Sequence, residues 1–326
     1  MMLYVNGLAI ALDRHESGAD INFVSHAHTD HIAAAKRSNP VCASAETLAL
    51  MDAAYGIRAT TVNGGRLPES MRMLDSGHML GAKQLAVTDE AHGTKTLYSG
   101  DFQMRKSAAA APIQITDADV VIIDSTYPYP DVGFDDHDEV EASLQEWTLN
   151  AMSNSVVLFS AYAMGKAQEL VRVLNNAGIR PMVGNKICRI NKVYEASGIR
   201  LEYAPLHADD GSLAVGSDNF VGIVEGKELK ELAYSLAKYE CRNVSTAVAS
   251  GFAKVFRFNM DAQFPLSDHA DFSQSIDYIE STGAKKVVTY GSNQRLFANN
   301  LRAKGYDAMP FLEAPTNLFD GGLRTQ

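Results

Sequence analysis

The strongest constraint on the fold is a heptapeptide at residues 25–31, Ser-His-Ala-His-Thr-Asp-His, which directly follows the apolar run at 21–24. If that run is a strand, His26 and His28 project to one side, because side-chain direction along a strand repeats every two residues. A turn then brings the last two ligand groups back towards the same point. Neutral imidazole and carboxylate suit zinc, manganese or iron, so the segment predicts a metal site. We predict a helix over residues 32–36. The alternative to a metal site is a polar loop that caps this helix, which does not explain so many ligand groups.

Composition limits the class of protein. The chain has 326 residues, 46% of them hydrophobic, which suggests about two domains of ~150 residues each. A formal net charge of −10 gives no general attraction for nucleic acid, so a polyanion would need a local basic groove or metal ions. Three widely spaced cysteines indicate a reduced, cytoplasmic protein. We expect neither a secretory signal nor a membrane span, because no apolar run of ~18 residues occurs.

The pattern of predicted secondary structure differs between successive regions of the chain. Residues 1–128 contain short strand candidates bounded by Gly, Asp and Ser. After an acidic break at 131–138, strands alternate with helices, and one of these strands is expected at 200–203. This alternation is typical of an α/β unit with a mainly parallel sheet. From residue 265 onward a helix, a strand and a second helix follow. The fold class expected for the whole chain is therefore α/β, in the broad sense that includes α+β.

Further ligand residues occur after the heptapeptide. His78 lies between glycines that let the backbone turn sharply, and Asp101 follows a predicted strand at 96–99. Asp13 closes the strand candidate at 8–12. Each residue taken alone also fits an ordinary loop or turn position. Together and in this order, they resemble the metallo-β-lactamase superfamily, in which an αββα sandwich carries metal ligands on loops at one edge of its sheets. Asp13 matches the early supporting aspartate of that family.

Three later motifs narrow the resemblance to the β-CASP nucleases, the branch with the mRNA 3′-end cleavage factor, RNase J and the DNA cross-link repair nucleases. They are Asp124-Ser125-Thr126-Tyr127, the stretch 160–170 with Lys166 before Ala-Gln-Glu, and the stretch 265–271 around His269. The resemblance implies a metallo-β-lactamase domain over residues 1–128 and 264–326. It also implies an inserted β-CASP α/β domain over residues 129–263.

The resemblance further implies which residues bind metal. The ligands of the first ion would be His26, His28, His78 and Asp101. Asp30, His31 and a shared Asp101 would hold the second. One or two zinc ions, with manganese as the alternative, would turn a bridging water into hydroxide near neutral pH.

Other motif residues receive catalytic and binding roles by the same resemblance. His269 would be the general acid that protonates the leaving oxygen, unless it is a satisfied structural group. Asp124 would accept a hydrogen bond from His269 and keep it protonated. Asp30 counts among the catalytic residues as well as the ligands. Lys166 and Ser267 would contact the substrate, although any single lysine also fits a solvated surface.

One motif departs from the family pattern. The RNA-acting branches have a strand-end His-Gly that contributes to the second metal, whereas Tyr290 stands there in this chain and no histidine follows His269. A neutral tyrosine with a pKa near 10 is a poor ligand at pH 7. A weaker second metal site is therefore expected. Because some DNA-acting members also lack that histidine, Tyr290 weakens the argument for RNA.

The resulting prediction is metal-dependent hydrolysis of nucleic-acid phosphodiester bonds by an RNA-processing or RNA-degrading nuclease, acting on ends or internally. The alternative is a DNA exonuclease that acts in repair. A hydrolase of small esters would need neither residues 129–263 nor His269, and a non-catalytic nucleic-acid-binding subunit usually lacks several ligands rather than one. The expected partner is single-stranded RNA or DNA rather than a membrane, and the sequence is compatible with a homodimer.

Overall fold

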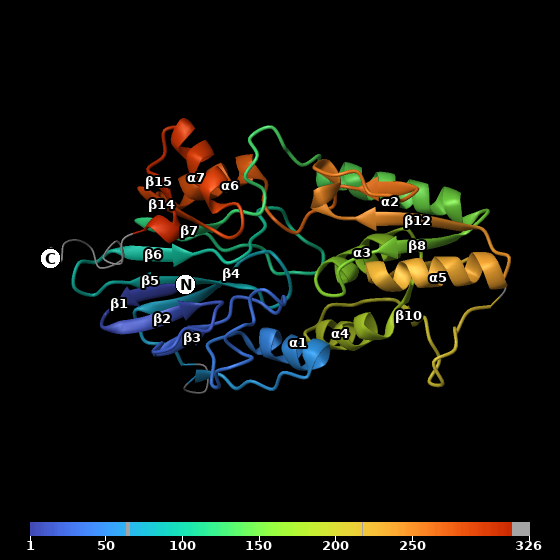
Figure 1. Cartoon of the computed structure of the whole chain (residues 1–326), viewed down its shortest axis with the longest axis horizontal. Helices are drawn as coiled ribbons and strands as arrows, with labels where there is room; N and C mark the ends of the chain where they lie inside the picture. The colour runs from blue at the N-terminus through green and yellow to red at the C-terminus, as the bar shows by residue number, and fades with distance from the viewer. Residues whose placement is uncertain (63–65, 217, 315–326) are drawn as a thin grey trace. The chain divides into compact units, whose positions relative to one another are not determined.

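The computed structural model describes residues 1–62, 66–216 and 218–314, and the chain forms two compact units (Figure 1). Unit 1 consists of Met1–Lys106, Ala110–Gly133 and His269–Gln326, and unit 2 of Ser107–Ala109 and Phe134–Asp268. The sequence placed the domain boundaries a few residues earlier, at 128 and 264. That the units are a metallo-β-lactamase domain and a β-CASP domain stays a prediction.

Unit 1 is built on two sheets that share one core. The smaller sheet has the order β1-β2-β3, with β1 at Met2–Val5, β2 at Leu8–Leu12 and β3 at Ile21–Phe23. The larger has the order β15-β14-β7-β6-β5-β4. Its strands are β4 (Met71–Asp75), β5 (Lys83–Thr88), β6 (Lys95–Tyr98), β7 (Val120–Asp124), β14 (Lys286–Tyr290) and β15 (Ala308–Pro310). Leu12 and Phe23 of the smaller sheet belong to the same buried cluster as Leu85 and Ile122 of the larger.

Helices cover the other face of the larger sheet. Val121 and Ile123 alternate with Ile122 along β7, so they point away from the smaller sheet. They pack with Phe272 of α6 (Phe272–Thr282) and Phe297 of α7 (Gln294–Ala303). All five residues of β7 are buried because both of its faces are covered. Helix α1 (Ala45–Tyr55) and the short 3₁₀ turn η3 (Phe311–Glu313) complete the unit.

Unit 2 contains a parallel six-stranded sheet with the order β10-β9-β11-β8-β12-β13. Its strands are β8 (Val156–Ser160), β9 (Met182–Val183), β10 (Ala204–Pro205), β11 (Val221–Val224), β12 (Val244–Ala249) and β13 (Ala262–Phe264). Its helices are α2 (His137–Met152), α3 (Lys166–Asn176), α4 (Asn185–Ala196), α5 (Gly226–Tyr239) and the 3₁₀ turn η2 (Gly251–Lys254). The mixed α/β architecture of the two units confirms the predicted fold class.

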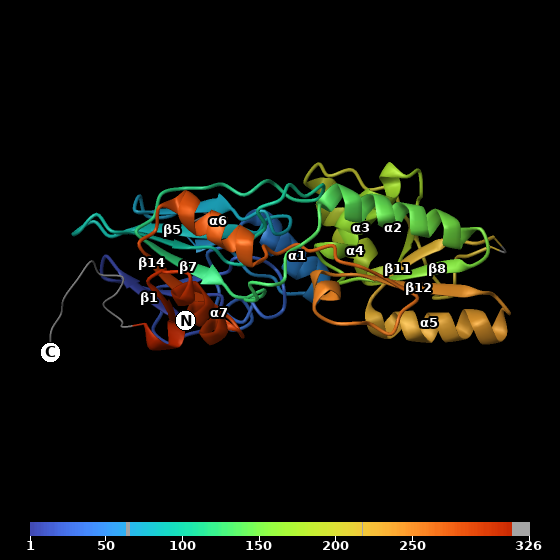
Figure 2. The same cartoon turned by 90° about the horizontal axis from the view of Figure 1, so that it is seen from above.

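The helices of unit 2 lie on both faces of its sheet (Figure 2). Leu158 of β8 packs with Leu232 and Leu236 of α5, whereas the next residue, Phe159, points to the opposite face. There the Phe159 ring lies 6.0 Å from the ring of Trp147 in α2, between centroids. Strands covered on both sides read as continuous apolar runs, as β8 and β11 do. No helix among the described residues is both long and apolar enough to cross a membrane.

Two predictions of local structure are wrong. Residues 33–37 form turns rather than a helix, because five residues are too few to offset the cost of nucleating one. The strand predicted at 200–203 is absent, and β10 contains only Ala204–Pro205. In the segment 200–203, side chains bind the backbone carbonyls instead. Asn175 donates to the Glu202 carbonyl at 2.8 Å, and Arg180 donates to the Tyr203 carbonyl at 2.9 Å.

Candidate metal centre

The predicted ligands of unit 1 gather at one edge of its sheets. Strands β6, β7 and β14 run parallel, so their carboxyl ends meet at the same edge. Asp101 follows β6, Asp124 ends β7 and Tyr290 ends β14. His26 and His28 follow β3, and His78 lies on the connection from β4 to β5. Residues that are far apart in the chain therefore meet at this edge of the sheets.

Four donor atoms converge on one point. One ligand atom from each of His26, His28, His78 and Asp101 lies within 4.8 Å of all the others. His28 Nδ1 is 3.0 Å from His26 Nε2 and 3.2 Å from His78 Nε2. Asp101 Oδ2 is 3.6 Å from His26 Nε2 and 3.9 Å from His78 Nε2. Ligands held ~2.0–2.1 Å from a tetrahedral zinc ion are about 3.3 Å apart. The donor set therefore fits a single metal ion.

The predicted ligands of a second ion lie beside the first group. His31 Nε2 is 3.4 Å from Asp101 Oδ2 and 3.6 Å from Asp30 Oδ2. The Asp30 side chain is 77% exposed, whereas that of His31 is 6% exposed. Asp101 thus faces both the four converging donors and the predicted ligands of the second ion. The second set of ligands is open to solvent at Asp30.

Asp13 supports this arrangement from behind. Its carboxylate accepts hydrogen bonds from the Ser25 amide, the Ser25 hydroxyl and the Tyr98 hydroxyl, each at 2.6 Å. The same carboxylate lies 2.7 Å from His31 Nδ1, which leaves His31 Nε2 directed at Asp101. A carboxylate behind a metal-binding imidazole fixes its tautomer and orientation. The sequence gives no signal for this role of Tyr98, because a buried tyrosine inside a strand looks like ordinary core.

Two of the three buried histidines, His26 and His31, differ in the direction of their pKa shifts. Burial lowers the pKa of His26 well below its ordinary value, and the nearby His31 adds to the effect. Burial also opposes protonation of His31, but the carboxylates of Asp101 and Asp13 outweigh it and hold the pKa of His31 well above its ordinary value. Without a metal ion near neutral pH, His26 is therefore neutral and His31 carries a proton.

This difference predicts a pH order of metal loss. An ion at His26, His28 and His78 displaces no proton from His26, whereas an ion on His31 Nε2 must displace one, so its affinity falls earlier as the pH drops. We expect the metal content after dialysis between about pH 8 and pH 5.5 to fall in two steps, with the ion at His31 lost first. Elemental analysis of the dialysed protein measures this. Loss of all metal in a single step would contradict the assignment.

The role of Asp13 can be tested with little disturbance. Asp13 has a φ of 57°, a conformation that asparagine tolerates well. Asp13→Asn keeps the shape but removes the charge that orients His31, so we expect metal affinity to fall by ~10–100-fold. Competition with a chelator measures this affinity, and Asp20→Asn serves as the control, because Asp20 accepts a hydrogen bond from a backbone amide in the same sheet. Unchanged metal affinity in Asp13→Asn would refute the supporting role.

His269 and Asp124 lie next to the four converging donors. His269 Nδ1 is 3.2 Å from Asp124 Oδ2 and 4.0 Å from Asp101 Oδ2. The other oxygen of Asp124 accepts from the amide and hydroxyl of Thr126 at 3.0 and 2.9 Å. Burial and the charge of Asp101 raise the pKa of Asp124, and the hydrogen bond to His269 opposes that rise. Gln103 donates to the His269 carbonyl at 3.1 Å, which helps to fix its position.

Tyr290 contacts His31 on the side that faces Asp13. Its hydroxyl is 3.2 Å from His31 Nδ1, the nitrogen that faces Asp13. Its ring packs against Tyr98, with centroids 5.3 Å apart. Burial and the charges of Asp101 and Asp13 keep the pKa of Tyr290 well above its ordinary value, so the phenol stays neutral. The weaker second metal site stays a prediction, and this placement agrees with a supporting role for Tyr290.

The two predicted substrate contacts lie in unit 2 and are buried. Lys166 is 1% exposed, and its ammonium group donates to Glu169 at 2.6 Å and lies 3.8 Å from Asp268. These two carboxylates account for the burial of the ammonium group as a structural ion pair, and its contact with substrate stays a prediction. Ser267 is 7% exposed, and its contact with substrate stays a prediction.

Comparisons with known proteins give relatives of several kinds, and no family model matches the chain. It is 28% identical to a probable DNA ligase of Opitutus terrae over 99% of its own length and 31% of the ligase. It is 29% identical, over 47% of its length, to 99% of an uncharacterized protein in the lig 3′ region of Acidianus ambivalens. An RNase J-like protein of Methanocaldococcus jannaschii is 26% identical over 48% of this chain and 36% of that protein. The chain thus spans about a third of the ligase and of the RNase J-like protein.

A solved structure shares the fold. A protein of unknown function from Enterococcus faecalis V583 superposes with a TM-score of 0.57 over 92% of this chain and 81% of its own. The sequence identity is 12%, so this likeness supports the fold alone.

Proposed function

We propose that the protein is a metal-dependent nuclease of the β-CASP type, which hydrolyses phosphodiester bonds in nucleic acid. The observation that carries the proposal is the convergence of His26, His28, His78 and Asp101 within 4.8 Å, with the His269–Asp124 pair beside them. The names of the relatives support nucleic-acid processing, since they include a probable DNA ligase and an RNase J-like protein.

Each residue has a distinct task in this proposal. A metal ion in the four-donor site would supply Lewis acidity towards a phosphoryl oxygen and make a water molecule acidic. Asp13 holds His31 in one orientation, and Asp30 offers a carboxylate on the solvent side. His269 delivers a proton to the leaving oxygen. Asp124, which is ionised once paired with a protonated His269, favours the charged imidazole and aims its ring.

We propose DNA as the preferred substrate, with RNA as the second candidate. The match to a probable DNA ligase covers 99% of this chain, whereas the match to an RNase J-like protein covers 48%. Tyr290 in place of the strand-end histidine agrees with DNA, because that histidine is typical of the RNA-acting branches. A match to about a third of a protein named probable DNA ligase suits a role in the trimming of DNA ends before they are sealed.

End-labelled strands test this proposal directly. The protein is stripped with chelator, reloaded with zinc or manganese, and incubated with single-stranded DNA, duplex DNA and single-stranded RNA of one sequence. We expect metal-dependent cleavage, fastest on DNA, and the pattern of labelled products separates removal from an end from internal cutting. Faster cleavage of RNA would favour the second candidate. Hydrolysis of small esters without cleavage of any strand would contradict a nuclease.

A further inference from the structure

A pocket of about 500 Å³ lies in unit 2, at the carboxyl end of its parallel sheet. Several of the residues that line it lie at the ends of three strands: Tyr162 two residues after β8, Glu225 directly after β11 and Ser250 directly after β12. Strands β8 and β12 are neighbours in the sheet. After β8 the chain continues to β9, towards one edge of the sheet, and after β12 it continues to β13, at the opposite edge. Open parallel sheets bind ligands at such a switch point, and the volume lies in the range of small-ligand sites.

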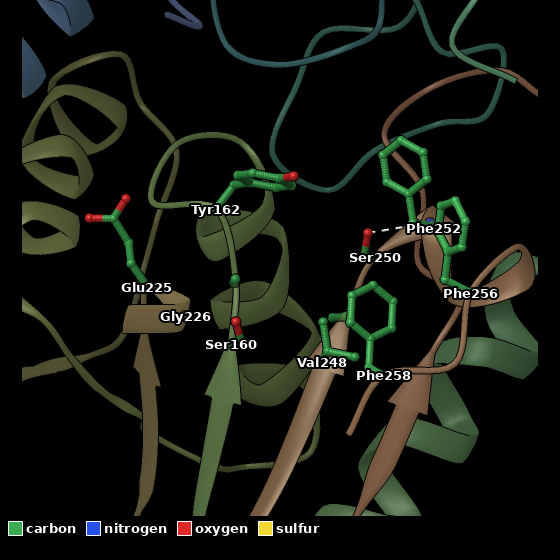
Figure 3. A pocket seen from close by; sticks show the side chains of 11 residues that line it. Ser160, Tyr162, Glu225, Gly226, Val248, Ser250, Phe252, Phe256 and Phe258 are labelled. Carbon is green, nitrogen blue, oxygen red and sulfur yellow. Dashed lines mark hydrogen bonds between the residues drawn. The ribbon is translucent and has the colours of Figure 1, made fainter. Parts of the chain in front are cut away.

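Aromatic rings form the walls of this pocket (Figure 3). Tyr162 lies on one side, and Phe252, Phe256 and Phe258 lie on the other. Tyr162 is 65% exposed and Phe256 is 58% exposed, so these rings contribute little to the core of unit 2. Large exposed apolar side chains that face one cavity mark a binding site more often than scattered ones do.

Basic residues alternate with these rings along the chain. Residues 252–258 read Phe-Ala-Lys-Val-Phe-Arg-Phe, and both Lys254 and Arg257 are exposed. Lys254 pairs with Asp135 at 2.6 Å, and Arg257 adds positive charge beside Phe256. Proteins that bind single strands combine rings, on which bases stack, with cations that follow the phosphates.

We propose that this pocket binds an unpaired base of a nucleic-acid strand by stacking on Tyr162 and Phe256, with Arg257 at the adjoining phosphate. The inference rests on the proposed function for the kind of ligand, but it assigns a binding site that the metal centre does not include. The hydroxyls of Ser160 and Ser250 offer hydrogen-bond partners for the edge of a base. A purely apolar ligand would use neither these groups nor the alternating charges.

The test compares two strands of about ten nucleotides, one normal single-stranded DNA and one that is abasic throughout. Binding is followed by fluorescence anisotropy with chelator present, so that no cleavage occurs. We expect Phe256→Ala and Tyr162→Ala each to weaken binding of the normal strand by roughly 5- to 100-fold. On the abasic strand both should change the Kd less than about twofold, because no base remains to stack.

Two control variants sharpen the result. Tyr239→Ala removes a 70% exposed ring from α5 outside the pocket and should leave both Kd values unchanged. Arg257→Gln should weaken both strands alike, because both carry phosphates. Phe256→Leu keeps an apolar side chain without the ring, and we expect it to lose affinity as Phe256→Ala does.

Several results would overturn the pocket assignment. They are an unchanged Kd in Phe256→Ala and Tyr162→Ala, an equal loss on both strands, recovery of affinity in Phe256→Leu, and no measurable binding of the parent to the normal strand. Failure of the proposed function looks different. A parent that binds through the pocket but cleaves no strand after metal reloading would leave this inference standing, and cleavage with unchanged binding in the variants would remove it alone.

Discussion

The variant His269→Ala should lower cleavage of a natural phosphodiester by ~10²–10⁴-fold, the range typical of losing a positioned proton donor. His269 is held beside the candidate metal centre by Asp124 at 3.2 Å. It lies outside the group of four converging donors, although it forms another possible metal-binding group with Asp101 and Asp124, and we assign it to proton transfer. The folded state and the metal content should therefore remain those of the parent. Initial rates on labelled DNA, together with elemental analysis of the same sample, measure both expectations.

Leaving-group dependence separates a proton donor from a positioning residue. A phosphodiester with a nitrophenolate leaving group needs little protonation, so the loss caused by His269→Ala should be much smaller on it. His92→Ala is the matched control, because this half-exposed histidine pairs with Asp89 in the same unit, away from the ligands. An equal loss on both substrates would leave His269 only a positioning role, and loss of metal in His269→Ala would make it a ligand.

The variant His78→Ala should abolish tight metal binding and lower cleavage by ~10³-fold or more, because several kcal/mol of charge stabilisation depend on the ion. His78 is 2% exposed, and its Nε2 atom lies 3.2 Å from His28 Nδ1. Removing it leaves three of the four donors, with an open side to the site. Elemental analysis after gel filtration and initial rates on DNA measure the two effects.

Thermal unfolding shows whether His78→Ala acts through the metal or through the fold. A ligand that binds only the folded state raises the melting temperature, so zinc should raise the Tm of the stripped parent and leave that of His78→Ala unchanged. The stripped parent and the stripped variant should melt within a few degrees of each other. Full metal occupancy in His78→Ala would rule out His78 as a ligand. A variant that unfolds at room temperature would instead assign His78 to the core of unit 1.

Much of the candidate site could be predicted from the sequence, because its residues are tied to local rules. His26 and His28 lie two residues apart in the short segment that follows β3, and the glycines around His78 allow its sharp turn. The alternation of strands and helices after residue 138 indicates the parallel sheet of unit 2, which the structure contains. These inferences depend only on residues that are close together in the chain. The resemblance to a known family then combined them into one predicted site.

Other features depend on which distant groups the fold brings together. Lys166 looks like a phosphate contact in sequence, yet Glu169 and Asp268 enclose it, because burial of α3 leaves an ammonium group no stable state except an ion pair. Tyr290 replaces a histidine in the family pattern, and only the packing of β14 beside β7 places its hydroxyl at His31. The aromatic pocket is assembled from the ends of three strands that the chain order separates. The sequence by itself therefore determined the class of fold and predicted which residues would carry the metal chemistry, because hydrophobic patterns and turn residues act over a few positions. Burial, protonation and the shape of the pocket were decided by tertiary structure, since they depend on contacts between residues far apart in the chain.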